Sequence, residues 1–388
     1  MMQLKSKYSV KKSNFQHRMV DLFAGCGGLS LGLEQAGFSP WFVNEIVEQF
    51  ANTYKFNHKL TDEHYYIGDI AILNEHLDEY DELFTDITLV CGGPPCQGFS
   101  MANRQRILDD PRNSLYKQYL VFLSHVRPQF FIMENVKGMM NKIDEIIQNF
   151  KEYLGENYQY DYAILKAQDF GVPQNRERFI MIGNRIGINP KVIFEEINKH
   201  KRTPFVLRDA LEGLPHLEAR KEKGAKDVED EKSGFTVRDF TYKRNAFYNF
   251  INDGRSIDKL YNHKNRYNNE RDIEIYRRMP QGANSLHESI ADIMPYKRRN
   301  DIFKDKYFKL DENQICKTIT SHMKFDCNMY IHPWEARGLS PREAARIQTF
   351  PDDYVFTGAQ NMWYAQIGNA VPVKLAKAIG DGIMKFIE

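Results

Sequence analysis

The stretch Met19 to Phe38, MVDLFAGCGGLSLGLEQAGF, joins an apolar run, a glycine-rich turn and an amphipathic segment without interruption. The apolar run predicts a short buried strand, and the spacing of Leu29, Leu33 and Ala36 places these side chains on one face of a helix. Glycines between a strand and a helix let a ligand come close to the backbone. The stretch therefore predicts the first strand–turn–helix unit of an α/β fold, with a binding loop where the strand ends.

Short apolar runs alternate with amphipathic stretches as far as about Gly183, which predicts a mostly parallel sheet with helices on both faces. The expected strands are Met19 to Phe23, Trp41 to Asn44, Ile87 to Cys91, Phe130 to Met133 and Phe179 to Ile182, with a weaker candidate at Tyr65 to Ile70. Open sheets of this kind bind ligands at the carboxyl ends of their strands. We expect Glu45, Cys96 and Glu134 just past three of these ends. Asp69 occupies the equivalent place in the weaker strand.

The residues at this edge favour an adenosine-type ligand. Ser30 stands where the dinucleotide fingerprint needs Gly or Ala, so a nicotinamide or flavin cofactor is disfavoured, and no Walker A pattern is present. Glu45 follows Asp21 at about the spacing at which an acidic residue meets ribose hydroxyls. Glu45 and Asp69 together indicate an adenosine-type ligand without a pyrophosphate. S-adenosylmethionine is the common ligand of this type. The alternative is that both acids are solvated strand ends.

Cys96 lies in GGPPCQGFS, Gly92 to Ser100, directly after an expected strand. The glycines allow a sharp loop and the prolines fix its backbone, so the thiol is held in place. A free cysteine is often a small buried apolar residue, but its proline, glutamine and serine neighbours are poor core material. The loop therefore predicts an active-site thiol.

Composition narrows the class of protein. The 388 residues are 42% hydrophobic and include five cysteines, which show neither CxxC spacing nor a zinc-ligand pattern. An odd cysteine count fits a reducing compartment, and we expect no metal site. There is no apolar run of about eighteen residues, and the basic N-terminal stretch is not followed by an apolar one, so a membrane span and a secretory signal are not indicated. We expect a cytoplasmic protein.

The net charge is only +1, so binding to nucleic acid requires that charge be segregated along the fold. The segment Thr241 to Leu310 holds 15 Lys and Arg against 9 Asp and Glu. It also contains aromatic residues, which could equally well belong to a core or contact DNA. Before it, Glu218 to Gly234 has the composition of a solvated linker. We expect an irregular second domain that contacts DNA. Beyond it, Leu375, Ile379 and Ile383 predict a helix that packs back on the first domain.

Eight motifs, in order across nearly the whole chain, resemble those of the DNA (cytosine-5) methyltransferase family. They are Asp21 to Phe38, Asn44-Glu45, Gly68 to Ile70, GGPPCQGFS, Glu134 to Val136, QNRER at Gln174 to Arg178, PREAAR at Pro341 to Arg346 and QIGNAVP at Gln366 to Pro372. One such match is weak, whereas eight in the family's order are specific. The resemblance implies a Rossmann-like S-adenosylmethionine-dependent methyltransferase domain at residues 1–200, a smaller irregular target-recognition domain at 201–340, and a segment 341–388 that returns to the catalytic domain.

The resemblance also implies the reaction, which is transfer of a methyl group from S-adenosylmethionine to carbon 5 of cytosine in a specific double-stranded DNA sequence. Carbon 5 is a poor nucleophile until the Cys96 thiolate adds to carbon 6, and the base must first be flipped out of the duplex. Glu134 is assigned to ring nitrogen 3 and the exocyclic amine, and Arg178 to the ring carbonyl. Arg176 and Arg178 are the candidates for stabilising the thiolate.

The resemblance also implies the cofactor residues, which are Phe23, Gly25, Gly27, Glu45, Asp69, Ile70 and Asn369. It places Gln97 and Ser100 near the DNA backbone or the displaced base, and Arg104 and Arg106 follow on the same loop as candidates for binding phosphate. For the two arginines, exposed solvated charge is the alternative.

Two other functions stay open, a tRNA cytosine-5 methyltransferase and a catalytically inactive DNA-binding relative. The tRNA group carries Cys-Phe-Thr where this chain has Gly-Phe-Ser, and its recognition region is smaller than the roughly 150 residues between Arg178 and the PREAAR motif. The presence of Cys96, Glu134 and Arg178 argues against an inactive relative. Because the cofactor motif begins within about twenty residues of the start, we expect a bacterial or phage restriction-modification enzyme. We expect a nucleoid-associated monomer, with a cognate restriction endonuclease acting separately if one exists.

Overall fold

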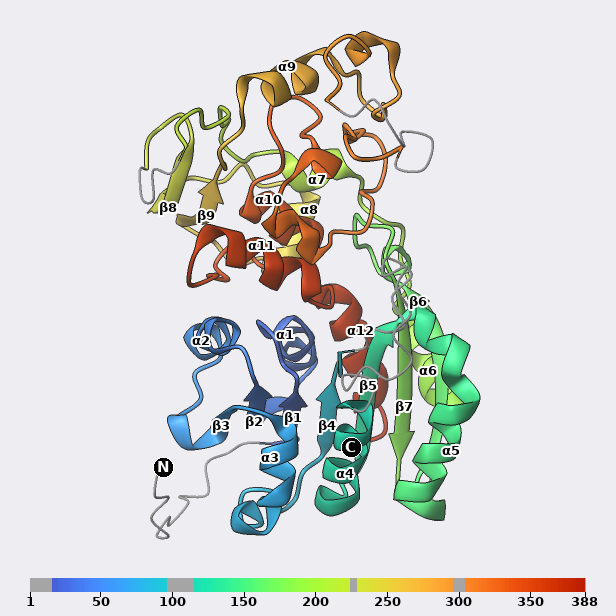
Figure 1. The fold of residues 1–388 in the computed structure, drawn as a ribbon. Helices are drawn as coiled ribbons and strands as arrows, with labels where there is room; N and C mark the ends of the chain where they lie inside the picture. Colours follow the sequence, from blue (N-terminus) through green and yellow to red (C-terminus); the bar gives the residue numbers. More distant parts are fainter. Residues whose placement is uncertain (1–15, 96–114, 224–228, 296–303, 388) are drawn as a thin grey trace.

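The computed structural model describes residues 16–95, 115–223, 229–295 and 304–387. The centre of the larger domain is a seven-stranded sheet in the order β3-β2-β1-β4-β5-β7-β6 (Figure 1). Its strands are β1 Arg18–Leu22, β2 Ser39–Glu45, β3 Tyr65–Ile67, β4 Leu89–Gly92, β5 Phe130–Val136, β6 Gln159–Lys166 and β7 Glu177–Asn184. Strands β1 to β5 pair in parallel, whereas β7 runs antiparallel to both β5 and β6. The predicted mostly parallel sheet is confirmed.

Three details of the strands differ from the prediction. Glu134 lies inside β5 rather than past its end, because that strand continues to Val136, and Glu45 is the last residue of β2. The edge strand β6 was not predicted, because its half-buried side chains give no continuous apolar run. The strand around Phe179 is antiparallel, so its first residues lie at the carboxyl end of β5, with Arg178 opposite Val136.

Helices cover both faces of the sheet. Helices α3 Ile70–Glu75, α4 Leu115–Val126 and α5 Ile143–Leu154 pack on one face against strand residues such as Val20. Helices α1 Gly28–Gln35, α6 Pro190–Lys199 and α12 Val373–Met384 pack on the other face against residues such as Met19. Successive strand residues thus point into two different cores, as the period of a strand requires. The C-terminal helix predicted from its apolar spacing is α12, and it packs on the larger domain as expected.

The smaller domain, at the top of Figure 1, has its own core. This core contains side chains of α7 Leu207–Leu211, α8 Ala246–Asn252, α10 Pro341–Ile347 and α11 Gln360–Asn369. Around it lie the antiparallel hairpin of β8 Gly234–Asp239 and β9 Lys259–Lys264, and helix α9 Glu270–Arg278. Helix α2 Glu48–Asn57 belongs to the larger domain. The domain limits at residues 200 and 340 stay a prediction, but α10 and α11, which follow residue 340, contribute to the core of the smaller domain.

The PREAAR motif forms α10 and is buried throughout. The Arg342 guanidinium donates to three backbone carbonyls, and Arg346 pairs with Asp352 at 2.7 Å. Buried charges are tolerated when they are paired or fully hydrogen-bonded. The motif therefore contributes to the core of the smaller domain.

The basic segment Thr241 to Leu310 divides its residues between core and surface. Tyr242, Phe247, Tyr248 and Tyr276 are buried and are therefore core residues. Some of its cations pair with acids outside the segment, as Lys243 does with Glu212 and Arg255 with Asp353. The positive electrostatic field that this segment offers to DNA is therefore weaker than its number of Lys and Arg residues suggests. None of the helices in the described ranges is long and apolar enough to span a bilayer.

Candidate functional site

A cavity of about 1080 Å³ opens at the carboxyl edge of the parallel strands, where the sheet faces the smaller domain. Residues that follow β1, β2 and β4 line it. Other parts of the chain contribute Thr318, Thr320, Ser321, His322, Gln366 and the residues 368–371. The structure brings nine predicted site residues to this cavity: Phe23, Gly25, Glu45, Asp69, Ile70, Glu134, Arg176, Arg178 and Asn369. Gly27 lies between the lining residues Cys26 and Gly28. Cys96, Gln97, Ser100, Arg104 and Arg106 lie outside the described residues.

Glu45 holds the glycine turn that follows β1. Its carboxylate accepts hydrogen bonds from the backbone N–H of Gly25 at 2.7 Å and of Val47 at 2.8 Å. Burial raises the pKa of Glu45, and these N–H donors oppose the rise. Gly25 has a φ of 58° and would have open space around a Cβ. The turn therefore leaves room beside its backbone for a ligand.

Gly27, two residues further on, has no such room. A Cβ there would lie 2.5 Å from His58 Nε2 and 2.9 Å from the Tyr354 hydroxyl. These two groups lie 3.1 Å apart, and the Tyr354 hydroxyl also donates to the Cys26 carbonyl. The Tyr354 hydroxyl thus joins the glycine turn to the loop after α10, and the space beside Gly27 admits only glycine.

Gly27→Ala should lower the free energy of unfolding by about 2–4 kcal/mol, because it combines a left-handed φ with overpacking. Gly25→Ala is the matched control, since it has a left-handed φ in open space and should cost only about 1 kcal/mol. Urea unfolding of both variants measures the difference. Equal losses would contradict the steric explanation.

Asp21 is a buried carboxyl at the end of β1. It accepts a hydrogen bond from the Ser30 hydroxyl at 2.6 Å, and that hydroxyl accepts one from Tyr54 at 2.7 Å. Burial raises the pKa of Asp21 to about 7, opposed by the bonds from Ser30 and Cys91. The carboxyl therefore changes protonation near neutral pH.

This raised pKa predicts a pH-dependent stability. The folded protein holds the Asp21 proton more tightly than the unfolded chain, so this carboxyl lowers stability progressively as pH rises from about 4 to about 7. Asp21→Asn removes that loss, so the variant's free energy of unfolding, relative to wild type, should be higher at pH 8 than at pH 5. Urea unfolding at the two pH values measures it, and a difference independent of pH would contradict the assignment.

The other half of the cavity holds an ion pair. The Nε of Arg178 lies 2.6 Å from Oε1 of Glu134, and these side chains are only 12% and 13% exposed. Burial lowers the pKa of Arg178, and the charge of Glu134 opposes this. A Cβ on Gly93 would lie 2.9 Å from Glu134 Oε2, so the chain after β4 passes close to the pair. Pro95, the residue before Cys96, lines the same cavity.

Arg176 uses its guanidinium differently from its neighbour Arg178. It is 1% exposed, and its two Nη atoms donate to the backbone carbonyls of Ile319, Gly368 and Ala370. It therefore holds the segments on the far wall of the cavity. Its assignment as a catalytic residue stays a prediction.

Two features of the cavity were not singled out from the sequence. The turn Thr318 to His322 matches none of the eight motifs, and only its position in the fold brings it to the cavity. Gln366 lies in the last motif and is 1% exposed. Its Nε2 donates to the Thr357 carbonyl at 3.1 Å, while its Oε1 has no hydrogen-bond partner in the described part of the chain. A buried amide oxygen without a partner fits a ligand donor in the cavity.

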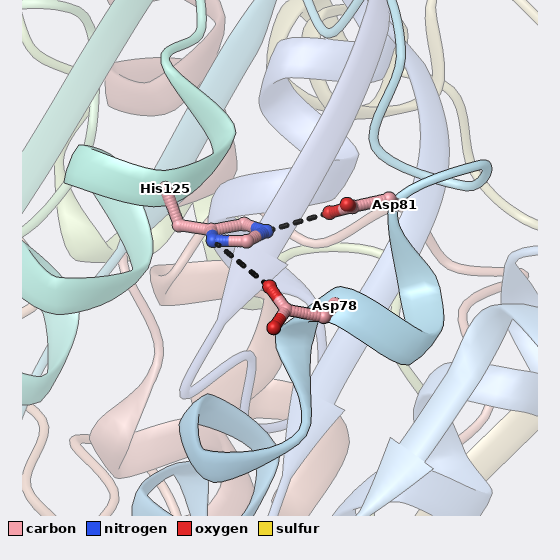
Figure 2. Close-up of side chains that lie close together, drawn as sticks. All are labelled: Asp78, Asp81 and His125. Atoms are coloured by element: carbon pink, nitrogen blue, oxygen red, sulfur yellow. Dashed lines mark hydrogen bonds and ion pairs between the residues drawn. The ribbon is translucent and has the colours of Figure 1, made fainter.

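Asp78, Asp81 and His125 form a separate surface cluster (Figure 2). They precede β4 and β5, at the edge of the sheet opposite the cavity. The two nitrogens of His125 face different carboxylates, Nε2 at 2.7 Å from Asp81 and Nδ1 at 4.0 Å from Asp78. This arrangement, with each ring nitrogen facing its own carboxylate, fits separate contacts with the two acids better than one shared metal ion.

Comparison with known proteins agrees with the geometry. The family model of the C-5 cytosine-specific DNA methylases matches residues 17–385. Type II methyltransferase M.DdeI of Desulfomicrobium norvegicum is 29% identical over 95% of this chain and 89% of its own length. M.XorII of Xanthomonas oryzae pv. oryzae is 32% identical over 95% of this chain and 84% of its own.

A solved structure described as a DNA modification methyltransferase of an E. coli prophage has a TM-score of 0.74 and 27% identity, covering 95% of this chain and 99% of its own. The Dnmt2 methyltransferase of S. pombe shares the fold, with a TM-score of 0.55 at 16% identity, covering 95% and 99%. The family match spans nearly the whole chain, including both halves of the cavity. The chain belongs to the C-5 cytosine-specific DNA methylases, the enzymes that transfer a methyl group to carbon 5 of cytosine in DNA.

Proposed function

We propose that the methyl donor is S-adenosylmethionine and that the reaction proceeds on a flipped-out cytosine through a covalent adduct with Cys96. The observation that carries the proposal is that two unlike half-sites share one cavity. One half is a glycine turn braced by Glu45, and the other is the buried Glu134–Arg178 pair beside the chain that leads to Cys96.

The residues of the first half suit the donor. The open space beside Gly25 accommodates a ligand against the backbone, and the buried Gln366 Oε1 offers an unused acceptor. Glu45 is the candidate for the ribose hydroxyls, with Phe23, Asp69 and Ile70 around the adenine and Gly27 and Asn369 completing the site. When bound, S-adenosylmethionine supplies a methyl group on a positively charged sulfur.

In the second half, the Cys96 thiolate adds to carbon 6 of cytosine and forms a carbon–sulfur bond. Glu134 hydrogen-bonds to ring nitrogen 3 and the exocyclic amine, which stabilises the charge that the addition places on the ring. Arg178 fixes the Glu134 carboxylate and binds the ring carbonyl. After methylation, removal of the proton on carbon 5 expels the thiolate and restores the aromatic ring.

DNA reaches the cavity from the side of the smaller domain, and Gln97, Ser100, Arg104 and Arg106 contact the backbone or the displaced base. We further propose that the protein is a monomer in the cytoplasm, associated with the nucleoid. The names of the Type II relatives support a role beside a restriction endonuclease of the same specificity.

The proposal is tested with purified protein, labelled S-adenosylmethionine and a duplex that carries 5-fluorocytosine at the target position. Fluorine cannot leave carbon 5 as a cation, so elimination stops and the covalent adduct persists. We expect a labelled protein–DNA species that survives denaturation. Methylation of ordinary duplex without any trapped species would contradict the covalent step.

A further inference from the structure

Phe325 is an unusually exposed aromatic residue close to the cavity. At 64% it shares with Ile46 the highest exposure among the large apolar side chains of the described residues. It follows the short turn Ser321–Lys324, whose Ser321 and His322 line the cavity. The rings of Phe325 and His322 are 5.4 Å apart. The exposed ring thus contacts a residue that lines the cavity.

The backbone of this turn is held firmly. The Arg266 guanidinium donates to the carbonyls of Met323 and Phe325, both at 2.7 Å. On the other side, Gly368 of α11 packs so closely that a Cβ would lie 2.2 Å from the Ser321 nitrogen. Single exposed apolar residues are common and carry no meaning by themselves. Here the bonds from Arg266 and the close packing of Gly368 hold the backbone that carries the exposed ring.

The surroundings of the ring suit a polyanion. The Lys324 ammonium lies 4.8 Å from the centre of the Phe325 ring, and the Arg266 guanidinium donates to the Phe325 carbonyl. His322 is accompanied by Asp326 at 3.7 Å. An apolar ring flanked by cations matches the chemistry of DNA, which offers base faces between phosphates.

We propose that Phe325 packs against the base pair next to the target cytosine and stabilises the duplex when that cytosine leaves the stack. Flipping a base removes its stacking on both neighbours and exposes apolar faces to water. Aromatic and other apolar side chains that cover such faces offset part of this loss. Phe325 is thus a positioning residue for the reaction, and its role rests on the proposed flipped-out mechanism.

The test compares Phe325→Ala with Phe56→Ala on two duplexes. Phe56 lies on α2 and is 63% exposed, so it matches Phe325 in type and exposure, whereas only Phe325 has a ring contact with the cavity-lining His322. One duplex carries guanine opposite the target, and the other carries an abasic site there, so that the cytosine leaves the stack more easily. Specific methylation rates and equilibrium DNA binding are measured on both, with thermal unfolding as a check on folding.

On the paired duplex, Phe325→Ala should lower kcat/KM about tenfold or more, as loss of a base–aromatic contact does. On the abasic duplex the loss should shrink to about threefold or less. Phe56→Ala should stay within about twofold of wild type on both, and Phe325→Trp should keep most of the activity. Equal losses of Phe325→Ala on the two duplexes, or no loss on either, would overturn the proposal. If wild-type protein forms no trapped adduct, the proposed mechanism fails first, and this inference fails with it.

Discussion

Cys96→Ser is expected to abolish methyl transfer, with the rate falling by more than about 10⁴-fold, while DNA binding is largely kept. A serine hydroxyl is far less acidic and less nucleophilic than a thiol, so addition to carbon 6 is lost without removing a group that binds DNA. The measurements are transfer of labelled methyl groups and trapping on the 5-fluorocytosine duplex, with binding followed by gel shift.

The matched control is Cys91→Ser, which changes a nearby cysteine that is buried in β4 and points into the core. Its effect should be on stability, with the adduct still formed by protein that remains folded. Transfer by Cys96→Ser at near wild-type rate would remove the thiolate mechanism.

Glu134→Gln should lower turnover by about 10²- to 10³-fold. The amide cannot stabilise the charge on the ring as the carboxylate does, and it leaves the Arg178 guanidinium without a charged partner. Because both side chains are nearly buried, breaking this pair should also lower the free energy of unfolding by about 3–5 kcal/mol. Single-turnover methylation and urea unfolding measure the two effects separately.

Glu177→Gln provides the control for this prediction. Glu177 neighbours Arg178 and pairs with Lys137 at 2.8 Å, but these side chains are 30% and 62% exposed. Exposed pairs contribute little, so this variant should stay within about 1 kcal/mol and keep its activity. If both glutamate variants lost activity to the same degree, the special role of Glu134 would be wrong.

Much of the larger domain could be predicted from local patterns. The apolar runs of β1, β2, β4 and β5 are short, buried and separated by amphipathic helices, so the alternation identifies them. Glu45 and Asp69 could be placed together because parallel strands end at the same edge, and both line the cavity. The glycine turn could be assigned because its backbone conformation needs glycine at Gly25 and Gly27.

The rest depends on contacts between distant residues, which no local pattern contains. A parallel strand at Phe179 would have put Arg178 at the wrong edge of the sheet, and only the antiparallel pairing of β7 with β5 brings it to Glu134. The three backbone carbonyls that the Arg176 guanidinium binds come from segments far away in the sequence, so no local pattern predicts them. Phe325 carries no sequence signal, since its proposed role depends on a turn that folds against α11.

The most direct test of the account is base-resolution bisulfite sequencing of plasmid and host DNA after expression in cells without cytosine methylation, with Cys96→Ser alongside. We predict 5-methylcytosine at one fixed short sequence in cells that carry the wild-type chain and none in cells that carry the variant. Unmodified DNA from well-folded wild-type protein, or the same pattern from Cys96→Ser, would contradict the account.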